Sequence, residues 1–582
     1  MLKRLKTVSM MLFFLSTSAG TAYAVADYGM DNVLMTQQSG TCTGVVKDMA
    51  GETVIGASVV VKGTTVGTIT GIDGDFSIPN VKKGDVIQIS FVGYRTQEVV
   101  WNGTPLNIVL EDDSQALEEV VVVGYGSQRK VNVTGAVAMV DAKAIASRPV
   151  ANASQALQGV VPGLNLTVGN SGGSLDGRLS INIRGTGTIG DGSSSGPLIL
   201  IDGIEGDLNT VNPNDIESVS VLKDAASASI YGARASFGVI LVTTKSGKSG
   251  KTNVSYSGNV RFSNAIGLPD VMDSYKFAQY FNRANSNRGG GAIFSDAVME
   301  RIKQYQEGTL KATTVDNGSG IWQKWSNANG NTDWMDEFFG GWAPSHEHNV
   351  SINGGSEKTQ FMMSGSFLDQ DGLINHGSDN FQRYTLNAKI STAVTDWFKV
   401  TLNTKWTRED FNRPTYLTGQ FFHNLARKWP VHPAYDPNGF PMDEGEVEQM
   451  ENGGKQNSQK DFFTNQMNMI FEPIKNWKIN LEGSVRTTTQ YQHWEVLPVQ
   501  AYDVEGNPYY TVWDMGYGGY SAGSSRVNEY SWKENYYTTN IYSDYFKQFD
   551  NGHYFKVMAG FNAELYKTRN ISAQKNTLIS PN

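Results

Sequence analysis

The stretch Asn253-Val-Ser-Tyr-Ser-Gly-Asn-Val-Arg-Phe-Ser263 decides the fold of this chain. Its apolar residues Val254, Tyr256, Val260 and Phe262 alternate with polar residues at a period of two. Successive side chains of a β-strand point to opposite faces, whereas one face of a helix repeats about every 3.6 residues. The stretch therefore predicts a strand with one apolar and one polar face.

Eight further segments show the same alternation, so nine strands are expected between residues 253 and 582. Most of them have about the 9–11 residues that a tilted strand needs to cross a membrane. The eight segments are His348–Asn353, Thr359–Leu368, Arg383–Ser391, Phe398–Thr407, Phe462–Phe471, Lys478–Thr489, Tyr536–Phe546 and Tyr554–Tyr566.

The connections between these segments alternate in length. Residues 264–347 and 408–461 are long, and each long or medium connection is followed by a short one such as 354–358. Outer-membrane barrels have short periplasmic turns and long extracellular loops, whereas a soluble sandwich has no reason for this order. Trp397 and Trp477 lie beside short turns, where a girdle of interfacial aromatic residues is expected. We therefore expect a transmembrane antiparallel β-barrel.

The barrel is expected to be incomplete within this chain. Nine is an odd number, while single-chain bacterial barrels have even numbers of strands, about 22 in plugged transporters. The last residues, Ile579-Ser-Pro-Asn582, form no closing strand, and an open sheet edge is not tolerated in a bilayer. We expect a truncated sequence, a partial gene product or one piece of a split barrel.

The first residues indicate secretion. A charged start is followed by the apolar run Val8–Leu15 and by the small-x-small site Ala22-Tyr-Ala24. This order is typical of a signal peptide, which we predict at residues 1–24. No later run approaches the roughly 18 apolar residues of a membrane helix.

The composition narrows the possible functions. A formal net charge of -9 without a basic stripe argues against nucleic acid as a partner, because phosphates require a basic surface. Aromatic residues at 11% and 62 glycines, with only 18% charged residues, favour a β-rich protein. The single cysteine, Cys42, excludes an internal disulfide framework, and we expect it to be an ordinary strand residue.

Two segments precede the alternating region. Residues 40–111 contain short β-prone runs separated by glycines, which predicts a small β-sandwich. A linker at 112–129 follows, in which Val120–Val123 leads into Gly124-Tyr125-Gly126. Four consecutive valines form either a buried strand or an exposed strand that adds to the sheet edge of another protein. The residues alone leave both possibilities open.

Residues 130–247 form a unit of mixed α/β character. Its expected elements are two helices, Ser154–Val160 and Ala225–Tyr231, and three strands, Ile181–Arg184, Leu198–Ile201 and Val239–Thr244.

Three motifs resemble chemical sites but lack the required context. Residues 185–190 match the GxGxxG dinucleotide fingerprint, but no helix follows them. The GxSxG matches at 169–173 and 519–523 lack the strand and helix of a nucleophile elbow. His346 and His348 have no third metal ligand nearby in the sequence. We expect no catalytic residue, no metal and no cofactor, and hence no enzyme.

The most specific pattern lies between residues 181 and 247. These residues strongly resemble the plug domain of SusC/RagA-type TonB-linked outer-membrane proteins of Bacteroidota. The resemblance is carried by Ile181-Asn-Ile-Arg-Gly185, Pro197-Leu-Ile-Leu-Ile-Asp-Gly203, Asn214-Asp-Ile-Glu-Ser-Val-Ser-Val-Leu-Lys-Asp-Ala-Ala226, Ile230-Tyr-Gly-Ala-Arg-Ala235 and Gly238-Val-Ile-Leu-Val-Thr-Thr-Lys-Ser-Gly247.

The resemblance extends over essentially the whole mature chain. Residues 40–111 are similar to the carboxypeptidase-regulatory-like sandwich that often precedes this plug, and Asp333-Trp334 with His348–Gly355 is similar to the first barrel hairpin. The linker resembles the family's TonB-box region, which favours the strand-donor hypothesis. The TonB-box-like residues are Val120, Val121, Val122, Val123, Gly124, Tyr125 and Gly126.

The resemblance implies a mainly-β protein of the cell outer membrane, with an N-terminal sandwich (40–111), an α/β plug (130–247) and the first strands of a barrel (253–582). It implies active import of a nutrient, an oligosaccharide or less often a peptide. The implied partners are TonB with its inner-membrane energising complex, a SusD-like surface lipoprotein and outer-membrane lipid. One alternative is a non-transporting outer-membrane receptor. Another is a secreted adhesin or hydrolase, which the alternation of connection lengths disfavours.

Several plug residues are expected to have structural roles. Six charged residues are expected to hold the plug against the barrel or against itself, unless they are ordinary surface charges: Arg184, Asp202, Lys223, Asp224, Arg234 and Lys245. Four uncharged residues belong to the same motifs: Gly185, Gly203, Tyr231 and Gly232. Five loop tryptophans either stack on sugar rings or pack the loops together, and both possibilities stay open: Trp322, Trp325, Trp342, Trp429 and Trp513.

Overall fold

A computed structural model describes most of the chain, which divides into two compact units, residues 1–119 and 120–582. The expected signal peptide, the acidic segment 112–119, Gly124, Tyr125, Trp513 and the last residues, 578–582, lie outside the described residues. The described residues are 39–49, 51–91, 94–111, 120–123, 126–129, 136–146, 148, 150–168, 174–185, 187–188, 196–511, 523–549 and 553–577.

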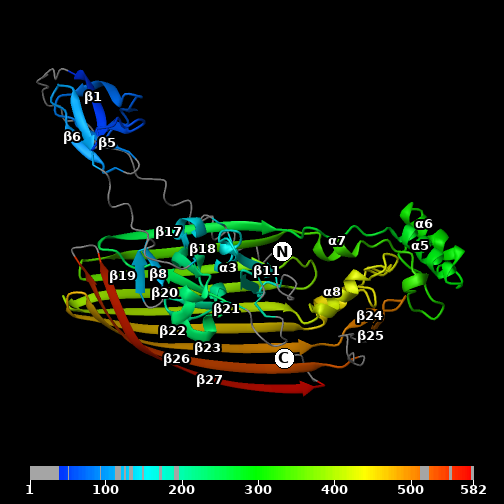
Figure 1. Cartoon of the computed structure of the whole chain (residues 1–582). Coiled ribbons are helices and arrows are strands. Elements are labelled where there is room, and N and C mark those ends of the chain that lie inside the picture. The colour runs from blue at the N-terminus through cyan, green and yellow to red at the C-terminus, as the bar shows by residue number, and fades with distance from the viewer. Residues whose placement is uncertain are drawn as a thin grey trace, which may run out of the picture. The chain divides into compact units, whose positions relative to one another are not determined.

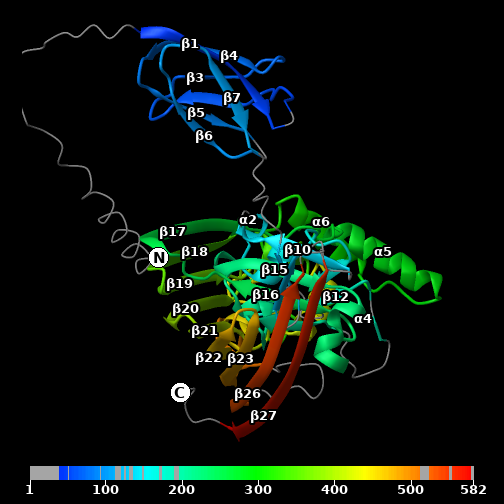
Figure 2. The same cartoon turned by 60° about the vertical axis from the view of Figure 1, so that its left-hand side comes forward.

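The first unit is a β-sandwich, as the sequence predicted. One sheet has the order β4-β1-β7 and the other has the order β3-β2-β5-β6. Apolar side chains between them, such as Val46, Phe76, Ile87 and Trp101, form one buried cluster. Figure 2 shows the two sheets facing each other. The strands are β1 (Ser39–Asp48), β2 (Ser58–Val61), β3 (Gly67–Ile69), β4 (Asp75–Lys82), β5 (Val86–Ser90), β6 (Gln97–Val100) and β7 (Leu106–Leu110).

A nine-stranded antiparallel sheet dominates the second unit, and we call it the barrel sheet. Its strands pair in chain order, so each hydrogen-bonds to the strands of the same sheet that precede and follow it in the sequence. The nine strands expected from the alternating pattern are therefore confirmed. They are β17 (Gly250–Ser263), β18 (Ala343–Gly355), β19 (Thr359–Asp371), β20 (Asn380–Thr395), β21 (Phe398–Pro414), β22 (Lys455–Ile474), β23 (Trp477–Val496), β26 (Arg526–Gln548) and β27 (Tyr554–Asn576).

The long connections all emerge at one end of the barrel sheet, which we call the loop end, and the short turns lie at the other, the turn end (Figure 1). This arrangement confirms the alternation of connection lengths. No helix in the described part of the chain is long and apolar enough to cross a membrane. The loop elements are α5 (Ser274–Asn287), α6 (Asp296–Gln306), α7 (Trp334–Phe339), α8 (Gly419–Ala426), α9 (Val447–Asn452), β24 (Gln500–Tyr502) and β25 (Pro508–Tyr510).

The strands are longer than the sequence predicted. β21 has 17 residues, and β26 and β27 have 23 each, against an expected length of about 9–11. The difference has a physical reason. Leu402 and Trp406 mark the apolar outer face of β21, but the outward residues beyond them, Arg408, Asp410 and Asn412, are polar. On the inward face of this end, Phe411 is the one apolar residue, so the period of two is too weak to see in the sequence.

Residues 136–245 form an α/β domain that we call the inner domain, and it lies against the concave face of the barrel sheet (Figure 2). Its five-stranded sheet has the order β10-β15-β16-β13-β14, and apolar clusters cover both of its faces. The strands of this sheet are β10 (Val137–Asp141), β13 (Leu198–Ile201), β14 (Ile204–Glu205), β15 (Ile216–Leu222) and β16 (Val239–Thr244); a hairpin β11 (Leu164–Val168)–β12 (Leu179–Ile183) and the helices α2 (Ala142–Ala146), α3 (Ala153–Leu157) and α4 (Ala225–Ala228) complete it.

Both helices expected in the inner domain are shorter than predicted. The first, α3, ends at Leu157 instead of Val160. The second, α4, ends at Ala228 and continues as a 3-10 segment over Ser229–Ala235. That segment is broken at Gly232, whose φ of 66° is left-handed and is tolerated by glycine without strain.

We predict that Cys42 is unreactive until the sandwich unfolds. Its side chain is fully buried, and burial raises the pKa of its thiol, so little nucleophilic thiolate is present. Maleimide labelling of the intact protein should be negligible in buffer and complete in denaturing urea. Rapid labelling under native conditions would contradict the packing of the sandwich.

Candidate functional site: the polar interface between inner domain and barrel sheet

The contact between the inner domain and the barrel sheet is mainly polar. A small apolar patch exists, in which Leu368, Phe381 and Phe411 of the sheet pack against Ala151 and Leu175. Elsewhere the sheet contributes hydrogen-bonding side chains from inward positions of β20 to β23. The main ones are Arg383, Asn387, Lys389, Asn403, Lys405, Thr407, Gln466 and Arg486.

The turn of the β13–β14 hairpin carries the central group of this interface. Ile201 pairs with Ile204, so only Asp202 and Gly203 form the turn. Both have left-handed backbone conformations, with φ of 50° and 87°. Asp-Gly is a preferred pair for this tight turn, because neither residue is strongly strained there. The local sequence thus fixes the position of the Asp202 carboxylate.

The Asp202 carboxylate lies between two lysines of the barrel sheet. It forms an ion pair with Lys405, and the Lys389 Nζ atom lies 3.6 Å from its Oδ1 atom. The Thr244 hydroxyl donates to Oδ2 at 2.6 Å, and the Asn403 amide donates at 3.1 Å. The side chain of Asp202 is only 8% exposed. Donors from both domains therefore surround one buried carboxylate.

These partners determine the charge state of Asp202. Burial alone would raise the pKa of its carboxyl, but the charges of Lys405 and Lys389 and the hydrogen bonds from Lys405 and Thr244 outweigh it and hold the pKa well below the usual range. A folded-state pKa below the unfolded value of about 3.9 stabilises the protein above that pH. This contribution is complete at neutral pH and is lost only as the pH falls below about 4.

A second charged cluster lies beside the first. Arg234 of the inner domain pairs with Glu564 of β27 at 2.6 Å and with Glu205 of β14 at 3.1 Å. The Tyr566 hydroxyl donates to Glu205 at 2.9 Å. Arg486 donates to the main-chain oxygen of Glu205. The hairpin β13–β14 is therefore held through both Asp202 and Glu205.

Several further contacts were not predicted from the sequence. Arg383 is buried and donates to the main-chain oxygens of Asn209 at 2.8 Å and Ala151 at 2.5 Å. Arg178 pairs with Asp207 and, at 3.3 Å, with Glu409 of β21. Inward polar residues look alike along every strand, so their partners cannot be found by pattern. The one indication in the sequence was Arg383, an arginine within an alternating strand.

The other charged residues singled out in the sequence lie within the inner domain. The Lys223 Nζ atom donates to Pro162 O at 2.6 Å. Asp224 caps α4 through Ser227 N and accepts from Ala136 N at 2.5 Å; these backbone hydrogen bonds lower the pKa of its carboxyl to about 2. Two main-chain bonds involve the remaining charges, Arg184 N to Gly163 O and Lys245 N to Asp215 O. Gly185, Tyr231 and Gly232 lie in turns or the 3-10 segment.

The TonB-box-like segment forms a short hairpin. β8 (Val120–Val123) pairs antiparallel with β9 (Gly126–Arg129), and these two strands form a sheet of their own. Figure 1 draws β8 toward the turn end of the barrel sheet. The chain enters the inner domain at Ala136, which precedes the edge strand β10 and is bound by Asp224 and Lys223.

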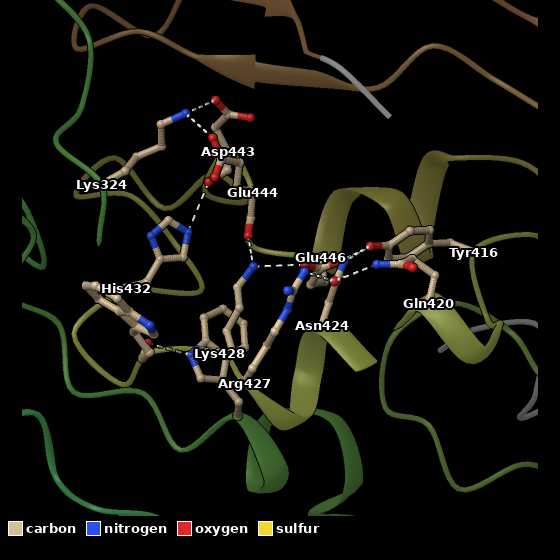
Figure 3. A network of polar contacts seen from close by, with 12 residues as sticks. Lys324, Tyr416, Gln420, Asn424, Arg427, Lys428, His432, Asp443, Glu444 and Glu446 are labelled. Carbon is tan, nitrogen blue, oxygen red and sulfur yellow. Dashed lines mark hydrogen bonds and ion pairs between the residues drawn. The ribbon is translucent and has the colours of Figure 1, made fainter. Parts of the chain in front are cut away.

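The loop end is held together by a buried network (Figure 3). Lys428 and Glu446, whose side chains are 2% and 7% exposed, form an ion pair of 2.9 Å. The Tyr416 hydroxyl donates to Glu446 and accepts from Asn424 at 3.0 Å. Since a buried charge is costly without a partner, this pair fixes the fold of the loop at 415–454.

Aromatic rings complete the loop network. The Lys428 Nζ atom lies 5.1 Å from the ring centre of Trp325 and 5.3 Å from that of Trp334. His432 stacks on Trp325, and burial together with the charge of Lys428 holds its pKa well below the usual range. Trp429 packs against Phe277 and Phe281 of α5 and against Phe294. Trp325 and Trp429 thus pack loops together, whereas Trp342 is 66% exposed.

Among the described residues, no group of three or more His, Cys, Asp or Glu side chains is arranged to hold a metal ion. His346 faces Asp369 at 3.7 Å, and His348 shares a hydrogen bond with the Tyr256 hydroxyl at 2.8 Å.

The architecture defines a class: an α/β plug on the inner face of an outer-membrane barrel sheet, preceded by a sandwich. Residues 129–239 match the TonB-dependent receptor plug domain, and residues 42–122 match the CarboxypepD_reg-like domain. The inner domain is therefore a plug domain. The matched relatives and structural neighbours are named as receptors and importers rather than enzymes.

Individual relatives agree with this class. The TonB-dependent receptor SusC of Bacteroides thetaiotaomicron is 36% identical over 63% of this chain and 33% of its own length, and a TonB-dependent receptor of Formosa agariphila is 33% identical over 67% and 34%. The chain thus spans about a third of these relatives. The RagAB peptide importer shares the fold, with a TM-score of 0.63 and 23% identity over 79% of this chain and 50% of that one. The two domain matches and the curated relatives support the SusC/RagA family of TonB-dependent outer-membrane proteins as the family of this chain.

We predict that Asp202→Asn loosens the plug. The amide keeps the shape of the side chain but removes the carboxylate that Lys405 and Lys389 face, and breaking a buried pair on one side costs about 3–5 kcal/mol. The urea midpoint for protease cleavage of the plug in outer-membrane fragments should fall accordingly. Glu217→Gln, on an exposed position of β15, is the control and should shift the midpoint little. Equal shifts for the two variants would contradict the assignment.

We also predict that Lys428→Met destabilises the loop end far more than Lys276→Met does. The Lys428 substitution removes the cationic partner of the buried Glu446, which should lower the stability of the loop by about 3–5 kcal/mol. Lys276 pairs with Asp273 at 2.9 Å on the surface, with 75% of its side chain exposed, and such pairs contribute about 0–1 kcal/mol. Hydrogen-exchange protection of residues 415–454 measures the difference. Similar protection in both variants would show that the buried pair is not essential.

Proposed function

We propose that the protein imports an oligosaccharide across the outer membrane with energy transmitted by TonB. A SusD-like lipoprotein would cover the loop end. The observation that carries this proposal is the polar contact between plug and barrel sheet. Water can replace hydrogen bonds and ion pairs when two surfaces separate, whereas exposing a large apolar interface would cost about 25 cal/mol per Å². A plug seated by polar contacts is suited to repeated displacement.

The connectivity supports a route for the pulling force. TonB would pair, by main-chain hydrogen bonds, with the edge of β8 that has no partner strand among the described residues. Tension on β8 and β9 would reach Ala136 and then β10, an edge strand paired only with β15 in the described sheet. An edge strand pulled from its end separates one hydrogen bond at a time. The Asp202 hairpin lies at the opposite edge of the same sheet, so its contacts would be the last to release.

The proposal is tested by disabling β8 while leaving the rest of the protein unchanged. Deleting Val120–Val123 should reduce uptake of labelled oligosaccharide to background, because no strand remains for TonB. Binding of the same oligosaccharide to purified outer membranes should stay within about twofold of the wild type. The control replaces all four valines by threonine, which keeps β-propensity and the main-chain hydrogen bonds, and should retain uptake.

Three outcomes would count against the proposal. Uptake that survives the deletion would remove the TonB-box assignment. Binding without uptake in the wild type would indicate a non-transporting receptor. Uptake of peptides but not of oligosaccharides would change the cargo class and leave the energy coupling intact.

A further inference from the structure

Three positive charges lie together on the outward face of β26 and β27. Glu534 and Glu564 of these strands face the plug, so the odd-numbered residues of both strands face outward. Lys533 of β26 stands directly opposite Arg569 of β27 in the register, and Lys567 precedes Arg569 by two residues on the same face. Opposite residues of an antiparallel pair have Cα atoms about 4.5–5.5 Å apart, and alternate residues of one strand about 7 Å. The three side chains therefore leave the sheet from one small area, which we call the cationic patch.

No carboxylate adjoins the cationic patch on its own face. Lys533 lies on a strand that is paired on both sides, and its neighbours in the same row are Thr489 of β23 and Arg569. Lys567 stands opposite Asn535. Among the residues that the structure describes, none forms an ion pair or a side-chain hydrogen bond with any of the three cations.

The nearest outward acids already have cationic partners. Asp461 lies two strands away from Lys533 in the same row, and Arg408 holds it through Nε at 2.8 Å. Glu529 lies four residues before Lys533 on β26 and faces His493 at 2.7 Å. Like charges directly opposite each other in a sheet repel. The cationic patch is thus a place where a bound anion would relieve repulsion within the sheet.

The position of the cationic patch indicates the source of such an anion. On β27 the outward residues from Val557 to Leu565 are all apolar. This stretch rises about 27 Å along the strand, or about 21 Å along the membrane normal at a tilt near 40°, close to the roughly 25 Å of the apolar band of a barrel. Lys567 is the next outward residue toward the loop end. Because long loops of outer-membrane barrels are extracellular, the cationic patch lies at the level of the outer-leaflet headgroups.

The neighbouring strand ends its apolar stretch at the same level. Tyr537 stands opposite Leu565, and their side chains are 38% and 49% exposed. Toward the loop end, the next outward residues of β26 are Asn535 and Lys533. An apolar surface bordered by cations suits a lipid that has acyl chains and an anionic headgroup. A phosphate group offers several acceptor oxygens, and arginine binds such groups through two parallel hydrogen bonds.

We infer that the cationic patch binds a phosphate of a glycolipid in the outer leaflet, with the acyl chains of that lipid along the apolar outward residues of β26 and β27. The three donors are the Lys533 and Lys567 ammonium groups and the Arg569 guanidinium. The site lies on the face of the sheet opposite the plug, so it is independent of the cargo and of the energy coupling proposed above.

The test uses the protein extracted from outer membranes, freed of lipid in detergent, and titrated in native mass spectrometry. The probes are lipid A with its phosphate and the same lipid after phosphatase treatment, which keeps the acyl chains but removes the charge. The phosphorylated form should bind about tenfold or more tightly. The triple variant Lys533→Gln, Lys567→Gln, Arg569→Gln should lose this preference. The double variant Lys533→Arg, Lys567→Arg keeps all three charges and should retain it.

The matched control is Lys575→Gln. Lys575 is exposed on the same face of β27, but it lies nearer the loop end and farther from the apolar stretch, so its loss should leave the preference unchanged. Equal binding of the two lipids by the wild type would overturn the inference, as would a preference that survives in the triple variant. Displacement of lipid A by an equal concentration of inorganic phosphate would also overturn it, because the patch would then bind a free anion without using the acyl chains.

Discussion

The burial of the Asp202 carboxylate is the constraint on which the rest of the plug's seating depends. A buried carboxylate is stable only with cationic and hydrogen-bonding partners, and here Lys389, Asn403 and Lys405 come from the barrel sheet. The Asp202 carboxylate can therefore be buried only where the sheet supplies those groups. This requirement positions the hairpin against β20 and β21. Arg234, which pairs with both Glu205 and Glu564, adds a charged contact to β27.

The loop end and the contact between plug and barrel sheet are held together by different kinds of interaction. At the loop end, aromatic rings surround the buried pair of Lys428 and Glu446, so the loops behave as one packed body. Between plug and sheet, the contacts are hydrogen bonds and ion pairs with few apolar side chains. Packed apolar groups resist separation, whereas polar groups can exchange partners with water. Packed apolar and aromatic groups thus dominate the loop end, and polar contacts dominate the seating of the plug.

Much of the fold was accessible from the sequence because burial on one face imposes a period of two. That periodicity identified all nine strands of the barrel sheet, and glycine-bounded runs identified the sandwich. The pattern failed where its cause was absent. At the loop end of β21 the outward residues are polar and Phe411 is the one apolar inward residue, so the alternation there is too weak to see. β6 (Gln97–Val100) likewise has too little alternation to stand out. The first residues of the 3-10 segment, Ser229–Tyr231, were predicted as part of an α-helix because periodicity does not distinguish the two kinds of helix over one or two turns.

The sequence by itself determined the elements and the local geometry: the alternating strands, the four valines of β8 and the Asp202-Gly203 turn that aims one carboxylate outward. Only the tertiary structure decided which residues meet that carboxylate. Lys389 and Lys405 lie far along the chain from Asp202, and in the sequence they resemble every other polar residue at an inward position. Periodicity specifies the face on which a side chain lies, but partners across a domain interface depend on how two separately folded surfaces fit together.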